Sequence, residues 1–147
     1  MASPQLPNDY GSPITLDVAK QAAARALAEA RKNGWTVAVA VVDTGGHLVY
    51  FERLDATQLA SADIAIAKAR SAALYKRPSK TFQEALAGGG AGLRVLRLKG
   101  AVPIDGGVPL LLNDRIVGGI GVSGAIPQQD GQCANAGAEG LSARNAS

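Results

Sequence analysis

The segment from Gly106 to Ala125 constrains the fold of this chain more than any other part of its sequence. Two apolar stretches flank a polar turn at Asn113-Asp114, which predicts an antiparallel hairpin over residues 108–122. The second stretch is unusually rich in glycine, with Gly118, Gly119, Gly121 and Gly124. A strand keeps glycine, at the expense of side-chain packing, where another backbone or a ligand must approach closely. These glycines therefore mark a candidate site.

Length and composition indicate one globular domain. The chain has 147 residues, of which 47% are hydrophobic, enough to bury roughly two-thirds of the unfolded surface in a single core. Its net charge is only +3, and its basic residues are scattered, which argues against a nucleic-acid-binding surface. The sequence shows no secretory leader and no apolar run of about 20 residues. We therefore expect a cytoplasmic protein whose partners include neither nucleic acid nor a membrane.

Small residues dominate the predicted core. Aromatic residues make up only 4% of the chain, which holds 18 glycines, so close backbone contacts must replace large side chains in the interior. Surfaces of this kind often finish burying themselves against a second copy of the chain. We therefore expect a homo-oligomer.

Hydrophobic periodicity predicts the first elements of the chain. Thr15 is a good N-cap for a first helix that closes at Gly34. Period-two alternation then predicts an antiparallel hairpin over residues 36–53. Thr57 is expected to cap a second helix that ends near Lys76.

The remaining elements complete an α+β pattern. We expect a short helix around residues 81–86 and a weak helix over 128–144, while residues 93–102 stay open between a short helix and an extended segment. Helix, hairpin, helices, hairpin and helix in this order indicate helices packed on an antiparallel β-sheet of about five strands. Residues 14–147 are expected to form this single domain, and residues 1–13 either a loose arm or an arm that lies on a neighbouring subunit.

Three charged residues are candidates for a binding or catalytic role. Lys68 stands among small apolar neighbours on the predicted second helix, so its ammonium must reach solvent, a carboxylate or a ligand. Arg53 and Asp55 leave the first hairpin together. They either form a structural ion pair or frame a pocket whose floor is the glycine-rich strand. Asp130, at the start of the last helix, is most simply a carboxylate that caps the helix or matches its dipole.

The single histidine and the single cysteine limit metal chemistry. With one of each, a structural zinc site cannot be assembled within one chain, and we predict no metal site. His47 follows a two-glycine turn and is either a solvated hairpin residue, a haem ligand or a proton carrier. Cys133 lies in an alanine-rich stretch and is expected to be a small buried apolar residue.

Two familiar motifs are present without their usual context. Gly119, Gly121 and Gly124 form a G-x-G-x-x-G, but the chain ends 23 residues later, too soon for the parallel strand and acidic residue of a dinucleotide fold. Ser123 resembles a hydrolase nucleophile, but His47 precedes it instead of following it. We set both interpretations aside.

The joint order of these motifs resembles the GlcG/HbpS-type haem-binding family, and the same module is similar to the C-terminal domain of PduO-type adenosyltransferases. The likeness covers residues 14 to about 140. The motifs that carry it are Val39–Val49 with its Asp-Thr-Gly-Gly-His turn, Arg53-Leu54-Asp55, Lys68-Ala69, Gly106–Leu110, Val117–Ala125 and Gln129-Asp130.

This resemblance implies an α+β sandwich that assembles as a homo-oligomer, with a cleft beside the glycine-rich strand and, in some members, haem binding and iron release. The Arg-x-Asp of the family maps to Arg53 and Asp55, its helix lysine to Lys68, and its Gly-Val-Ser-Gly strand end to residues 121–124. Gly131 stands where an acid is common in the family, which weakens a metal or acid–base role at that corner.

Few residues of this sequence are suited to haem. An axial ligand would have to be His47, a tyrosine, Lys68 or Cys133. The contacts to a cofactor that we expect are His47, Gly119, Gly121, Ser123 and Gly124.

We therefore expect a small-ligand-binding protein whose cleft uses Arg53 and Lys68 to hold an anionic group, with haem the ligand implied by the resemblance. The alternative is an enzyme acting on a small carboxylate or oxygenated metabolite. In that case Lys68, Arg53 and Asp55 act on the substrate, and the amides of residues 119–123 stabilise an oxyanion. A third interpretation, a purely structural assembly partner, needs no pocket.

Overall fold

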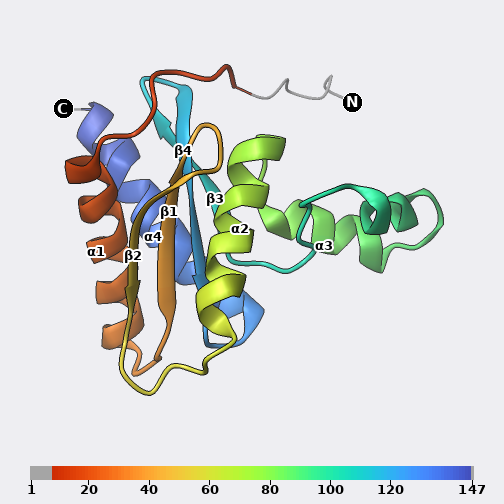
Figure 1. Cartoon of the computed structure of the whole chain (residues 1–147), viewed down its shortest axis with the longest axis horizontal. Coiled ribbons are helices and arrows are strands. Elements are labelled where there is room, and N and C mark those ends of the chain that lie inside the picture. Colours follow the sequence, from red (N-terminus) through yellow and green to blue (C-terminus); the bar gives the residue numbers. More distant parts are fainter. Residues whose placement is uncertain (1–7, 147) are drawn as a thin grey trace.

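The protein is built on a four-stranded antiparallel sheet. A computed structural model of the chain describes residues 8–146 (Figure 1). The elements in chain order are α1 (Leu16–Lys32), β1 (Ala38–Asp43), β2 (Leu48–Arg53), α2 (Ser61–Tyr75), α3 (Ser79–Ala87), the 3-10 helix η1 (Gly90–Arg97), β3 (Gly107–Leu112), β4 (Arg115–Ser123) and α4 (Pro127–Ala146). The strands lie in the order β2-β1-β4-β3.

This topology confirms the α+β class but corrects the expected number of strands from about five to four. Both predicted hairpins are present, and β1 and β4 join them antiparallel in the middle of the sheet. An isolated bridge between Tyr10 and Ile116 lies beside β4. It is too short to count as a fifth strand.

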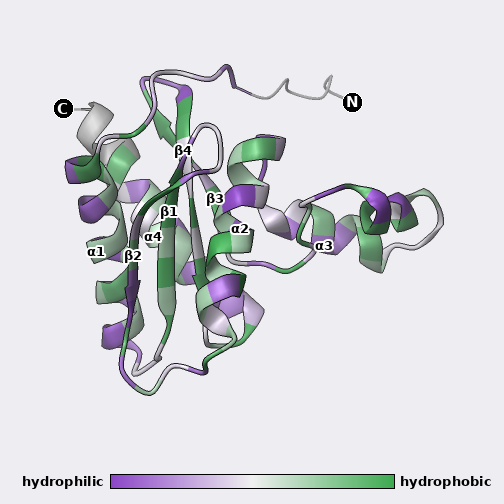
Figure 2. Cartoon of the chain, in the orientation of Figure 1, coloured by the Kyte–Doolittle hydropathy of each residue, from purple (hydrophilic) through white to green (hydrophobic). Residues whose placement is uncertain are grey.

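Helices cover both faces of the sheet (Figure 1). On one face α1 and α4 pack over a core that includes Val37, Val39 and Val41. On the other face α2 packs over Ala38 and Ala40. Strand β1 is apolar on both sides for this reason, and Figure 2 shows it predominantly green between helices that carry purple patches.

The predicted N-terminus is confirmed for α1 and is wrong for α2. Thr15 caps α1 as predicted, because its Oγ1 accepts a hydrogen bond from the N–H of Val18 at 3.3 Å. Thr57 does not cap α2. Its own N–H donates to Leu54 in a turn that precedes the helix, and α2 begins only at Ser61, after an Ala60 N-cap that supplies no side-chain bond.

The described part of the predicted N-terminal arm lies along its own sheet. The N–H of Ile116 donates to the carbonyl of Asp9 at 2.8 Å, and the N–H of Gly11 donates to Ile116 at 2.9 Å. The hydroxyl of Tyr10 donates to the carbonyl of Ala73 at the end of α2. Residues 1–7 of the predicted arm lie outside the described residues.

An arm formed by α3 and η1 projects from the helix–sheet body (Figure 1). The 3-10 helix covers the first part of residues 93–102, the segment that the sequence left open. Within residues 8–146, no helix combines the length and the apolar character needed to cross a membrane.

Candidate functional site

Lys68 connects two helices on opposite faces of the sheet. It lies on α2 and is 1% exposed. Its Nζ donates to the carbonyl oxygen of Val122 at 3.0 Å and to Oδ2 of Asp130, near the start of α4, at 3.1 Å. The sequence predicted that this ammonium reaches solvent, a carboxylate or a ligand, and in the structure it reaches a carboxylate.

The missing side chain of Gly106 leaves the space through which Lys68 passes. A Cβ at this position would lie 2.7 Å from Nζ of Lys68 and 2.6 Å from the carbonyl oxygen of Val122, and the φ of Gly106 is +131°. Only glycine combines this backbone conformation with the missing side chain. Lys68 therefore passes the sheet just before β3, at the edge.

Asp130 has a partner on each carboxylate oxygen. Oδ1 accepts a hydrogen bond from the N–H of Ala125, which lies just before α4, at 2.9 Å, and Oδ2 holds Lys68. Burial raises the pKa of Asp130 and lowers that of Lys68, while their mutual attraction opposes both shifts.

Asp105 is a third charged member of this cluster, which the sequence analysis missed. It is 9% exposed, and burial raises its pKa, with Lys80 and Lys68 opposing the shift. A Cβ at Gly131 would collide with its carboxylate. The signal in the sequence was Gly131, because its missing side chain leaves room for the carboxylate of Asp105.

Two glycines of β4, Gly119 and Gly121, face α2 instead of an open cleft. A Cβ at Gly119 would collide with the carbonyl oxygen of Ala69, and one at Gly121 with that of Ala65. The structure thus replaces the expected cleft at these two glycines by close helix–sheet packing, because the approaching backbone belongs to the chain itself.

The strand end predicted as part of the site is also enclosed. Ser123 is 3% exposed, and its Oγ lies 3.2 Å from Oγ of Ser61 at the beginning of α2. Gly124 has a φ of +147°, and a Cβ there would collide with the carbonyl oxygen of Thr36. A contact of either residue with a ligand stays a prediction.

Arg53 lies in one row with Ser123 across the sheet. Both residues pair with Ala38, Arg53 from β2 and Ser123 from β4. Paired residues point to the same face, and Ala38 belongs to the core beneath α2, so Arg53 lies on the α2 face. Arg53 and Asp55 are both exposed and form no ion pair with each other within residues 8–141.

His47 lies at the opposite end of β2 from Arg53. It follows the β1–β2 turn, its side chain is 79% exposed, and its Nδ1 is 3.3 Å from Oδ1 of Asp43. The five residue steps along β2 span roughly 17 Å. The structure therefore brings Arg53, Ser123 and Lys68 to one end of the sheet and leaves His47 at the other.

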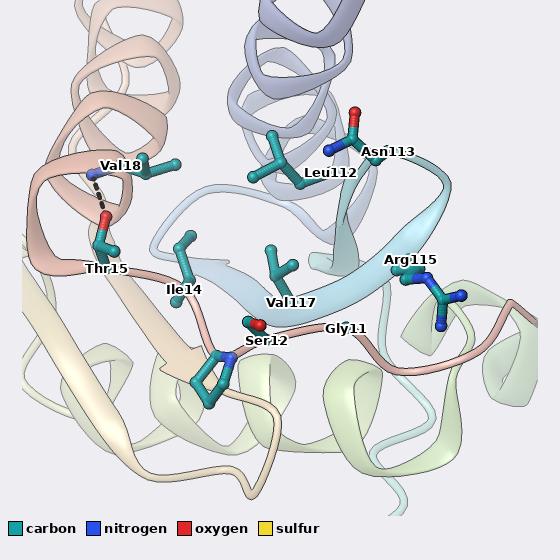
Figure 3. Close-up of a pocket in the computed structure, with 10 residues that line it drawn as sticks. Gly11, Ser12, Ile14, Thr15, Val18, Leu112, Asn113, Arg115 and Val117 are labelled. Atoms are coloured by element: carbon teal, nitrogen blue, oxygen red, sulfur yellow. Dashed lines mark hydrogen bonds between the residues drawn. The ribbon is translucent and has the colours of Figure 1, made fainter.

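Three cavities open elsewhere in the described part of the chain. The largest, of about 420 Å³, lies between residues 11–15, the start of α1 and the β3–β4 turn. Ile14, Leu112 and Val117 converge there, whereas the guanidinium of Arg115 points away (Figure 3). A second, of about 320 Å³, lies between α3 and η1, and a third, of about 250 Å³, flanks α2. None of these cavities was predicted from the sequence, because each lies between segments that are distant in the chain or irregular.

No group of three or more His, Cys, Asp or Glu side chains in the described residues is arranged to hold a metal ion. Cys133 is buried as expected, and burial raises the pKa of its thiol to about 12. The thiolate form that binds metals is therefore suppressed.

Known proteins match the chain over most of its length. Protein GlcG of Escherichia coli K12 is 39% identical over 95 residues, which cover 65% of this chain and 69% of that protein. The crystal structure of Klebsiella pneumoniae ORFY is 30% identical, with a TM-score of 0.82 over 96% of this chain and 99% of that one. A double mutant of Streptomyces reticuli HbpS is 32% identical, with a TM-score of 0.81 over 96% and 98% of the two chains.

A family model described as haem degrading protein HbpS-like matches residues 14–139. This span includes the hairpins, the buried Lys68 cluster and the glycine-rich strand, so it confirms the resemblance that the motifs indicated. The chain belongs to the HbpS-like family.

Proposed function

We propose that the protein binds a small molecule through an anionic group at the end of the sheet where Arg53 lies, with haem the first ligand to test. The observation that carries the proposal is the row of Arg53, Ala38 and Ser123, which sets an exposed cation on the sheet end that the N-terminus of α2 covers. No carboxylate within residues 8–141 pairs with Arg53. An unpaired guanidinium suits a ligand carboxylate.

The loop between β2 and α2 supports a polar ligand at this end. Thr57 is 6% exposed, and its Oγ1 has no hydrogen-bond partner in the described residues. A buried hydroxyl left in this state costs about 1–3 kcal/mol. An oxygen or N–H group of a bound molecule would form the missing hydrogen bond with this hydroxyl. The N-terminus of α2, the positive end of the helix dipole, would also attract an anionic ligand.

The residues at this end fit the acidic groups of haem but not its iron. Cys133 is a buried thiol, Lys68 is held by Asp130, and His47 is exposed but lies at the far end of β2. The tyrosine hydroxyls donate hydrogen bonds to protein oxygens at Tyr10, Tyr50 and Tyr75. The family description names haem, whereas the charge at Arg53 suits any small carboxylate.

Two titrations test the proposal. Haemin is followed by its Soret band, and citrate, a carboxylate without iron, by calorimetry. We expect Arg53→Gln to weaken binding roughly tenfold, since a charge-assisted hydrogen bond is lost. Arg115→Gln, an exposed arginine at the opposite end of the sheet, is the matched control and is expected to bind like the wild type.

Each outcome of these titrations decides a separate point. Citrate binding without saturable haemin binding assigns the site to an anion other than haem. Equal affinities in Arg53→Gln and the wild type refute the Arg53 site, and no binding of either probe refutes the function. If His47→Ala changes the Soret band and the arginine variants do not, the iron ligand is assigned to His47 at the β1–β2 turn.

One observation favours the enzyme alternative. Lys68 is buried beside Asp130 with a lowered pKa, and perturbed pairs of this kind occur in active sites. None of the three cavities reaches Lys68, which favours a structural role. If a folded Lys68→Met variant binds citrate as the wild type does, Lys68 does not touch the ligand.

A further inference from the structure

We propose that the cavity between α3 and η1 binds a medium-chain alkyl carboxylate, a small apolar molecule with one acidic head group. This site is separate from the Arg53 end of the sheet and does not rest on the function proposed there.

The cavity exists because α3 and η1 pack against each other outside the helix–sheet body (Figure 1). Gly92 of η1 lies directly on α3, where a Cβ would collide with the carbonyl oxygen of Ala85. Beside this contact the two helices border an open cavity of about 320 Å³, which falls at the lower end of the range of ligand pockets, roughly 300–1,000 Å³. A short alkyl chain suits this size.

The floor of the cavity is apolar and fixed by packing. Phe82 of α3 is 4% exposed and Val95 of η1 is 5% exposed, and Leu98 completes the lining at the end of η1. The ring of Phe82 meets that of Tyr75 edge-on, with 5.2 Å between the ring centroids. The cavity therefore has a hydrophobic surface that is already formed.

Two arginines line the same cavity without a carboxylate. Nε of Arg77 donates to the carbonyl of Tyr75 at 2.8 Å, and Nε of Arg94 donates to that of Ala91 at 3.0 Å. These bonds orient the guanidiniums, and that of Arg77 also lies over the ring of Phe82, 5.7 Å from its centroid. The terminal nitrogens of both arginines have no hydrogen-bond partner in the described part of the chain. Within residues 8–141 neither arginine has an ion-pair partner.

Charge complementarity selects an anionic occupant. Residues 76–99 contain six basic residues and one acidic residue. That acid, Glu84, lies 3.9 Å from Lys80 and does not line the cavity. Two like charges beside one apolar cavity repel each other, and the single negative charge of a bound carboxylate reduces this repulsion while its alkyl chain lies along the apolar lining.

Octanoate and 1-octanol, which differ in the head group, are the probes. Calorimetric titration of the full chain is expected to give stronger binding of octanoate than of 1-octanol. Arg77→Gln and Arg94→Gln are each expected to weaken octanoate binding roughly three- to tenfold and to leave 1-octanol unchanged. Arg97→Gln, on the same 3-10 helix but outside the cavity lining, is the matched control.

Further variants keep the test decisive. Arg94→Lys retains the charge and is expected to keep more octanoate affinity than Arg94→Gln, and circular dichroism checks that each variant folds. Octanoate affinity that is equal in both glutamine variants and the wild type refutes the site. Light scattering tests whether a second copy of the chain occupies the cavity instead. If the protein is an oligomer in which the cavity is covered, and octanoate neither binds there nor dissociates the oligomer, the proposal is wrong.

Discussion

Lys68 and Asp130 lie 62 residues apart in the sequence, and each is buried only because the other is present. Removing two charges from water is costly, and their attraction in the interior repays that cost when further hydrogen bonds are made. The carbonyl of Val122 and the N–H of Ala125 supply those bonds. At the scale of single residues, the burial of Lys68 and Asp130 therefore depends on both partners and on these two backbone groups.

Lys68→Met is expected to destabilise the fold by about 3–5 kcal/mol, because it leaves the carboxylate of Asp130 buried without its partner. Urea unfolding measures the loss. Lys20→Met, on the exposed face of α1, is the control and is expected to change the stability by no more than about 0.5 kcal/mol. A double variant, Lys68→Met with Asp130→Asn, is expected to recover part of the loss. Equal stability of Lys68→Met and Lys20→Met would contradict this account.

Asp105→Asn tests the pH dependence of the same cluster. The unfolded carboxyl titrates near 3.8, and burial raises the folded pKa above that value. Between the two pKa values the folded state holds more protons than the unfolded state, so the contribution of Asp105 to stability falls as the pH rises through this interval. The neutral variant escapes this fall.

We therefore expect Asp105→Asn to gain stability over the wild type as the pH rises above 3.8, with a constant gain above the folded pKa. Unfolding free energies from roughly pH 3 to pH 7 measure the difference. A difference that does not change with pH would show that Asp105 titrates alike in the folded and unfolded states.

At the scale of secondary-structure elements, the contact between α2 and β4 explains two of the glycines of β4. The carbonyl oxygens of Ala65 and Ala69 occupy the positions where side chains of Gly121 and Gly119 would stand. Backbone atoms cannot move aside as the end of a flexible side chain can. The spacing between this helix and the sheet therefore depends on individual glycines.

Gly121→Ala is expected to destabilise the protein by about 1–3 kcal/mol or more, because its Cβ overpacks the interface with α2. Thermal unfolding measures the change. Gly88→Ala is the matched control, since its Cβ would lie 3.6 Å from the nearest atom, an ordinary contact, and its effect is expected to stay within about 0.5 kcal/mol. If both variants unfold at the same temperature, the close packing of α2 on β4 is not what requires glycine.

The sequence predicted the elements whose cause is local. Thr15, the alternation over residues 36–53 and the Asn113-Asp114 turn each act on near neighbours, so α1 and both hairpins appear as expected. The predicted start of α2 was wrong because the N–H of Thr57 forms a hydrogen bond within the turn that precedes the helix. The pairing of Lys68 with Asp130, and the choice of a helix over a ligand beside Gly121, depend on contacts between distant segments that periodicity does not encode.

At the scale of the whole molecule, the expected homo-oligomer stays a prediction with support from the surface. Ten large apolar side chains are exposed among the described residues, and the three most exposed are Leu59 at 78%, Leu96 at 67% and Ile126 at 56%. Exposed apolar surface favours contact with another protein surface. We expect light scattering coupled to size exclusion to give a multiple of the chain mass of 14.9 kDa. A mass of one chain at every concentration would contradict the homo-oligomer.

The order in which the ion pair is synthesised follows from its position in the chain. Lys68 leaves the ribosome well before Asp130, since 62 residues separate them, and domains complete their packing only when all of their elements have emerged. Until the last helix is available, the ammonium of Lys68 must remain hydrated, and α2 cannot settle fully on its face of the sheet. Translation of the C-terminal residues thus controls when the opposite side of the protein can close.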